Sequence, residues 1–155
     1  MAKSADPMRV EVRRRMPAPR DIVFEAWTDP EGLRHWMCPG DVISAEAALD
    51  VRVGGNFRLV MKSKTAEHVH TGTYQVVDPP AKLVFTWTAN NQPQTLVTVE
   101  FLDHGEESEI VLTHEGFTQT DVAQRYQGGW GKITELFAAY LARNQGKKAT
   151  SVRTR

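Results

Sequence analysis

The sequence is poor in the features that mark secreted, membrane and nucleic-acid-binding proteins. Its 155 residues include a single cysteine, Cys38, so no internal disulfide can form, which fits a reducing compartment. The first residues, MAKSADP, lack the apolar core of a signal peptide, and no run approaches the roughly 20 apolar residues of a membrane-spanning helix. We therefore expect a cytoplasmic protein without a membrane partner.

Neither sign of charge is in excess. The 19 Lys and Arg residues equal the 19 Asp and Glu residues in number. This balance argues against a nucleic-acid partner, because binding to phosphates depends on surplus positive charge. The basic run Arg13-Arg14-Arg15 alternates around the end of a predicted strand, and we interpret it as a solvated edge that discourages pairing with other chains.

Catalytic and cofactor motifs are also missing. The sequence contains no G-x-S-x-G nucleophile elbow, no phosphate-binding glycine loop and no dinucleotide fingerprint. His68 and His70 stand two apart on a predicted strand and should point to one face, as two metal ligands would. No third ligand, H-E-x-x-H or C-x-x-C motif accompanies them, so we predict no metal, no cofactor and no dedicated catalytic motif.

The chain does contain short alternating segments of apolar and polar residues, separated by turn residues. With 41% apolar and 25% charged residues, it is typical of one globular domain, which we place at 8–144 between disordered ends at 1–7 and 145–155. Short strands in close succession favour an antiparallel meander. Strands are predicted at about 8–15, 43–49, 55–63, 68–77, 82–89, 94–102 and 108–115.

Helices are predicted in two places. After the first strand, apolar residues recur at helical spacing over 19–27, and Asp29-Pro30-Glu31 resembles the cap and first turn of a second short helix. A long helix is predicted over 118–143, with Thr118 and Asp121 as a capping box. Its apolar stripe recurs every three or four residues and comprises Tyr126, Trp130, Ile133, Phe137 and Tyr140.

The Gly54-Gly55 pair precedes a strand whose alternate residues are apolar, and it marks a corner in a strongly curved sheet. A curved sheet closed around an amphipathic helix buries the apolar faces of both elements. We therefore predict the α+β fold class, with a curved antiparallel sheet, two short helices after its first strand and a long C-terminal helix.

Five segments carry a family resemblance: PAPRDIVFEAWTDPEGLRHWMCP (17–39), DVRVGGNFRLVM (50–61), HTGTYQVVDPPAKLVFTW (70–87), LTHEGF (112–117) and GGW (128–130). In order and spacing the chain resembles the START-like or SRPBCC superfamily, and more narrowly its branch related to the activator of the heat-shock protein 90 ATPase. The resemblance implies the helix-grip fold shared with the birch-pollen allergen and polyketide cyclases. It also implies a hydrophobic cavity between the concave face of the sheet and the last helix.

The residues expected around this cavity are mostly apolar and point inward. Periodicity alone does not say whether the aromatic rings among them meet other protein groups or a ligand, so core packing and ligand contact stay open for each. The predicted cavity residues are Trp36, Phe57, Leu59, Met61, Tyr74, Phe85, Trp87, Val99, Leu112, His114, Phe117, Trp130 and Ile133.

Polar groups in the cavity are the candidates for enzyme chemistry. His114 follows Ile110 and Leu112 in register and should point inward, where an imidazole can orient a ligand or act as an acid or base. The alternative is a buried histidine whose hydrogen bonds are satisfied by a backbone carbonyl. His70 and Tyr74 complete this set of candidates.

Three glycines stand where the long helix is predicted: Gly128, Gly129 and Gly131. Each costs about 1 kcal/mol relative to alanine inside a helix, so some other feature should compensate. Close approach of a strand, a bend in the helix and an opening for a ligand are all consistent with the sequence.

Three hypotheses for function follow. The first is binding of a small hydrophobic or amphipathic ligand in the cavity. The second, from the resemblance, is an interaction module that binds a chaperone. The third, also from the resemblance, is a cyclase-, dehydratase- or hydrolase-type enzyme that uses the cavity histidines and Tyr74. A monomer and a homodimer are both consistent with the sequence.

Overall fold

The computed structural model describes residues 8–89 and 92–154, with side chains described as far as Asn144. The predicted disordered segment 1–7 lies outside the described residues. In chain order the elements are β1 (Val10–Met16), α1 (Arg20–Trp27), α2 (Pro30–Leu33), β2 (Ser44–Leu49), β3 (Asn56–Lys62), β4 (Glu67–Asp78), β5 (Lys82–Ala89), β6 (Thr95–His104), β7 (Glu107–Glu115) and α3 (Thr120–Thr154).

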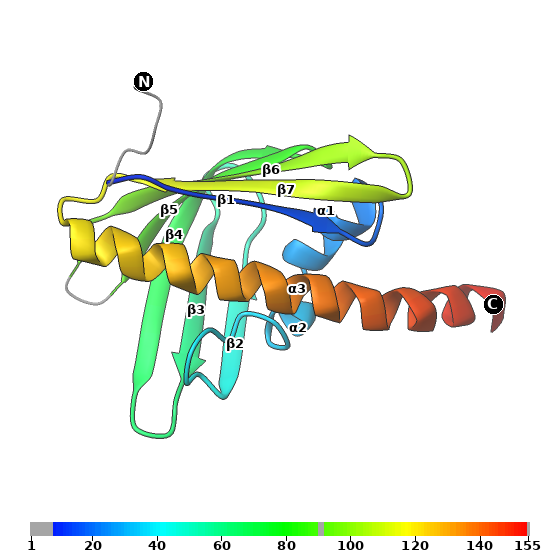
Figure 1. Ribbon diagram of the computed structural model, residues 1–155, viewed down its shortest axis with the longest axis horizontal. Coiled ribbons are helices and arrows are strands. Elements are labelled where there is room, and N and C mark those ends of the chain that lie inside the picture. The colour runs from blue at the N-terminus through cyan, green and yellow to red at the C-terminus, as the bar shows by residue number, and fades with distance from the viewer. Residues whose placement is uncertain (1–7, 90–91, 155) are drawn as a thin grey trace.

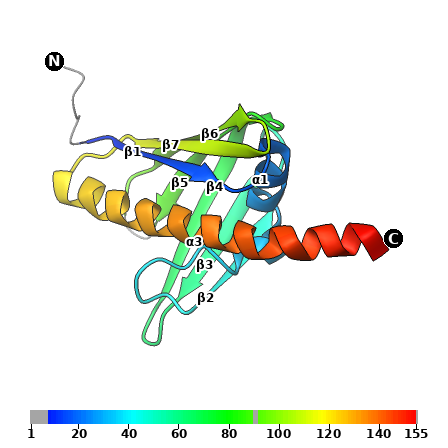
Figure 2. The ribbon, with the colours of Figure 1, turned by 45° about the vertical axis from the view of Figure 1, so that its right-hand side comes forward.

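The seven strands form one antiparallel sheet in the order β1-β7-β6-β5-β4-β3-β2. The sheet curls into a half-barrel: β1, β6 and β7 run along α3, whereas β2, β3 and β4 cross behind it (Figure 1). The turned view shows α3 lying in the hollow of this sheet (Figure 2). The predicted helix-grip architecture and the α+β class are confirmed.

Glycines allow the sheet to bend. Gly54 has φ +86°, a backbone conformation that side chains disfavour, and Gly55 lies so close to the Asp50 carbonyl that a Cβ there would overlap it. At Gly72 a Cβ would overlap both the Thr86 carbonyl and the Phe57 ring. The pairing of β4 with β5 also shifts register between Tyr74 and Val76, which is a β-bulge and adds curvature.

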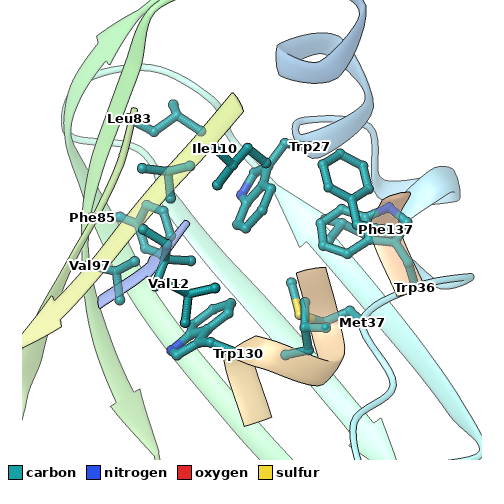
Figure 3. Close-up of a cluster of buried hydrophobic side chains, with 14 of the residues drawn as sticks. Val12, Trp27, Trp36, Met37, Leu83, Phe85, Val97, Ile110, Trp130 and Phe137 are labelled. Atoms are coloured by element: carbon teal, nitrogen blue, oxygen red, sulfur yellow. The ribbon is translucent and has the colours of Figure 1, made fainter. Parts of the chain in front are cut away.

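Aromatic side chains fill the space between the sheet and the helices. Trp27 of α1 lies between Trp36 and Trp130, with ring centroids 5.0 and 6.4 Å away, and Trp36 packs on Phe137 of α3 at 4.1 Å. Figure 3 shows these rings facing inward-pointing residues of the sheet, including Phe85. Of the apolar stripe predicted on the long helix, Trp130, Ile133 and Phe137 are buried in this core, whereas Tyr126 and Tyr140 at its two ends are half-buried.

One of the two predicted helix caps is confirmed and the other is wrong. The Asp29 cap is confirmed, since its carboxylate accepts a hydrogen bond from the Glu31 amide at 3.1 Å. The capping box predicted at Thr118 is wrong: α3 begins at Thr120, and the Gln119 carbonyl accepts the hydrogen bond of the Ala123 amide that opens the first turn. The α3 backbone continues past Arg143 to Thr154. The predicted domain bounds at 8–144 and the tail at 145–155 stay predictions.

Candidate functional site

An open groove of about 800 Å³ lies between the sheet and the first half of α3. β3, β4 and β5 supply one wall, the loop after α2 supplies the rim, and α3 supplies the other wall. Its buried apolar floor consists of Met61, Trp87, Val122, Trp130 and Ile133. Its other lining residues are Pro39, Gly40, Val42, His68, His70, Gln92, Gln124, Arg125, Tyr126, Gly128, Gly129 and Lys132.

Behind the groove the hollow of the sheet is almost filled. An inner cavity of only about 30 Å³ remains, which leaves room for no more than a few water molecules. Trp87 and Trp130 line both spaces, with ring centroids 5.3 Å apart, so this pair separates the groove from the inner cavity. The space available to a ligand is therefore the groove rather than the centre of the hollow.

The structure divides the predicted cavity residues among four environments. Met61, Trp87, Trp130 and Ile133 line the groove. The inner cavity takes Phe57, Leu59, Tyr74 and Phe85, and a separate space of about 20 Å³ takes Phe117. Fully buried in the core, away from these spaces, are Trp36, Val99, Leu112 and His114. Ligand contact stays a prediction for all of them.

Sequence reasoning missed most of the helix wall, although Gly128 and Gly129 gave a signal. A Cβ added at either glycine would meet no heavy atom within 4 Å. Close approach of a strand therefore does not explain this pair, and α3 shows no sharp kink in either view (Figures 1 and 2). Both glycines line the groove, so what they provide is open space along the helix backbone.

His70 is the groove residue with the most unusual environment. Its side chain is 8% exposed, its ring lies 4.8 Å from the Trp87 ring, and its Nδ1 has no hydrogen-bond partner among the described residues. Burial, and then the charge of His68, lower the pKa of His70 to about 4. The nearby His68 backbone has a smaller effect that raises the pKa of His70, but it forms no hydrogen bond with Nδ1. His70 is therefore neutral at pH 7 and retains hydrogen-bonding capacity.

His114 points inward as predicted, but its ring is fully used in the structure. Trp130 Nε1 donates to His114 Nδ1 at 3.0 Å, and His114 Nε2 lies 2.7 Å from Thr95 Oγ1. Because an indole nitrogen is only a donor, Nδ1 must accept, and in the neutral ring Nε2 donates to Thr95. Thr95 in turn donates to the Trp87 carbonyl at 3.0 Å. Two side chains therefore satisfy the ring, and not the backbone carbonyl that is the predicted alternative.

This chain of hydrogen bonds joins α3 to β6, β7 and β5 directly behind the groove. Burial, with a smaller effect of His70, lowers the pKa of His114 to about 3, which agrees with the neutral ring that the hydrogen bonds require. His114 thereby holds in place Trp130, one of the two tryptophans that separate the groove from the inner cavity.

The three candidates for enzyme chemistry lie in different places. His70 lines the groove, Tyr74 lines the inner cavity and His114 is in the core. Burial and the charge of Asp50 raise the pKa of Tyr74 to about 12, so its hydroxyl stays protonated. The structure gives these three side chains no shared cavity in which they could act on one substrate.

Groups of three or more potential metal ligands do not occur among the described residues, and His68 and His70 lack a third ligand there. Within the same part of the chain, no helix is long and apolar enough to cross a membrane.

Solved structures support the fold assignment. Mll3558 from Rhizobium loti is 28% identical, with a TM-score of 0.72 and coverage of 86% of this chain and 96% of that chain. NE0264 from Nitrosomonas europaea is 17% identical, with a TM-score of 0.78 and coverage of 92% and 99%. CalU16 from Micromonospora echinospora is 21% identical, with a TM-score of 0.67 and coverage of 92% and 82%. No curated protein gave a significant match.

The sequence also matches a family model over residues 17–142, which include both short helices, β2 to β7 and most of α3. The match agrees with the helix-grip fold and with the START-like resemblance of the sequence. The chain belongs to the family described as "Activator of Hsp90 ATPase homolog 1-like protein", within the START-like or SRPBCC superfamily.

Proposed function

We propose that the protein binds a small hydrophobic or amphipathic molecule in the groove between the sheet and α3. The observation that carries this proposal is an open groove of about 800 Å³ with a floor of buried apolar side chains. Ligand sites in proteins are typically concave, largely apolar and roughly 300–1,000 Å³ in volume.

The expected driving force is removal of apolar surface from water. A ligand that buries about 200 Å² of its apolar surface would gain roughly 5 kcal/mol, before the costs of ordering it are subtracted. The groove is already formed, because the Trp130–His114–Thr95 hydrogen bonds fix its floor to the sheet. Little further ordering of the protein is then needed when the ligand binds.

Gly128 and Gly129 support the same proposal. Each glycine costs about 1 kcal/mol relative to alanine in a helix interior, yet no packing contact at either position requires the absence of a Cβ. Use of that space by a ligand explains why this stability is given up.

A second hollow, of about 590 Å³, lies on the convex face of the sheet and is less suited to an apolar ligand. Its lining is mainly polar and includes Thr71, Thr73, Thr86 and Thr88. It also lacks a tryptophan floor, so we assign ligand binding to the groove.

Fluorescence of the apolar probe N-phenyl-1-naphthylamine tests the proposal. We expect the protein to bind the probe, and Gly129→Leu to abolish binding because the new side chain enters the groove. Gly131→Leu is the matched control: this glycine is on the same helix and a Cβ there also meets nothing, but it does not line the groove. Equal binding by both variants would contradict the proposal.

The family description favours a second candidate, binding to a chaperone. Such a module would use an exposed apolar surface. Among the described residues the exposed large hydrophobic side chains are few, namely Ile43, Val53 and Val76. A pull-down with purified heat-shock protein 90 tests this candidate. If the parent protein retains the chaperone and the Ile43→Ser or Val53→Ser variant does not, chaperone binding is favoured over ligand binding in the groove.

A further inference from the structure

The charged residues that line the groove all have the same sign. Arg125 and Lys132 are exposed at its mouth, and among the described residues no Asp or Glu lines it. The whole chain, in contrast, has equal numbers of acidic and basic residues. A groove with an apolar floor and a purely cationic rim is complementary to a ligand that has an apolar body and an acidic group.

The two cations are placed so that they reach the same part of the groove. Lys132 stands seven positions after Arg125, which is about two helical turns or roughly 10 Å along the axis, and puts both on one face of α3. Gly128 and Gly129 lie between them and leave that stretch of helix without side chains. An acidic group above the glycine pair is within reach of both long side chains.

Neither cation is committed to another strong contact. Lys132 Nζ lies 3.7 Å from Glu135 Oε1, but both side chains are more than half exposed, and such pairs contribute little. Arg125 forms no ion pair within the described part of the chain. Both are therefore free to bind an incoming anion.

His70 adds a polar group to the groove wall. It is nine-tenths buried, and its Nδ1 has no partner among the described residues. Because Nδ1 is itself shielded from solvent, a hydroxyl, carbonyl or acidic group of a ligand can satisfy it only if the ring turns towards the groove.

From these contacts we infer that the groove selects amphipathic molecules with a free acidic group. Their apolar body packs on Trp87 and Trp130, and their acidic group lies between Arg125 and Lys132. This inference rests on the proposed function, and it adds the chemical class of the ligand.

Two fluorescent probes that differ by one acidic group test it. 1-Anilinonaphthalene-8-sulfonate is N-phenyl-1-naphthylamine with an added sulfonate, which here stands for the acidic group of the ligand. We expect Arg125→Gln/Lys132→Gln to raise the Kd of the sulfonate probe about tenfold and to change the Kd of the neutral probe less than twofold. Added salt should weaken binding of the sulfonate probe to the parent protein, and less so to this variant.

Arg58→Gln/Lys82→Gln is the matched control, because it removes one Arg and one Lys from the convex side of the sheet and leaves the groove unchanged. It should leave both Kd values unchanged. Thermal unfolding of each variant checks that the fold is retained.

The outcomes separate the inference from the proposed function. If the neutral probe binds and Gly129→Leu blocks it, but Arg125→Gln/Lys132→Gln weakens both probes equally or neither, the inference on the acidic group is overturned and the proposed function stands. If the neutral probe does not bind, or Gly129→Leu leaves its binding intact, the proposed function fails and the inference fails with it.

Discussion

Replacement of His114 by glutamine should remove much of the acid sensitivity of the protein. The pKa of His114 falls from its ordinary value of 6.5 to about 3 in the folded state. Between these two pH values the unfolded chain takes up a proton at this residue and the folded chain does not. The free energy of unfolding must therefore decrease as the pH falls from 6.5 towards 3.

The size of the effect follows from the same two values. At pH 5, about 1.5 pH units below the ordinary pKa, the free energy of unfolding is about 2 kcal/mol lower, because each pH unit corresponds to about 1.36 kcal/mol. His70, with a pKa of about 4, contributes a similar amount at this pH. Together the two buried histidines should destabilise the protein by about 4 kcal/mol between pH 8 and pH 5.

Glutamine is the informative replacement because it does not titrate but has both functions of the neutral ring. Its amide oxygen can accept from Trp130 Nε1, and its amide nitrogen can donate to Thr95 Oγ1. Between pH 8 and pH 5, we expect the free energy of unfolding of His114→Gln to decrease by about 2 kcal/mol less than that of the parent. This difference does not depend on the stability of the variant at pH 8.

The assay is urea unfolding at pH 5, 6, 7 and 8, followed by tryptophan fluorescence. His35→Gln is the control, because it changes a histidine that is exposed. The same pH dependence in His114→Gln as in the parent would show that the folded state tolerates a charged ring at this position. The tautomer derived from the Trp130 hydrogen bond would then be wrong.

Other predictions concern the groove and the sheet. Gly128→Ala and Gly129→Ala should each raise the free energy of unfolding, measured in urea, by up to about 1 kcal/mol and also weaken binding of the neutral probe. A lower free energy of unfolding in both variants would show that the added methyl groups meet a contact after all. Gly72→Ala should destabilise by about 2–3 kcal/mol, because its Cβ overlaps the Thr86 carbonyl and the Phe57 ring, and an unchanged urea midpoint would refute this. Trp130→Phe should lower the free energy of unfolding by more than the lost ring area implies, because it leaves a buried nitrogen of the His114 ring without a hydrogen bond. This additional loss of about 1–3 kcal/mol should be absent when Trp130→Phe is made in the His114→Phe variant.

The fold was predictable from local patterns. Alternation in segments such as Phe57, Leu59 and Met61 specifies strands, and the spacing from Tyr126 to Phe137 specifies the long helix, because both patterns depend only on neighbouring residues. The Gly54-Gly55 corner was predictable for the same reason. The start of α3 at Thr120 was not predictable, because Thr118 is a residue type that often caps helices but does not cap this one.

The site was harder to predict, because it depends on contacts between distant elements. An inward-facing aromatic residue such as Trp36 or Phe85 has the same sequence pattern whether it fills the core or lines a ligand site. The partners of His114 come from α3 and β6, which no local pattern specifies. Arg125 and Lys132 resemble any solvated face of a helix until the open space between them is seen.

Native mass spectrometry of the protein purified from its own host, beside its Gly129→Leu variant, is the most direct test of the central claim that the groove holds a ligand. We expect an additional mass of a few hundred daltons on the parent protein and none on the variant. No additional mass on the parent protein, or the same mass on both proteins, would show that the groove holds no ligand.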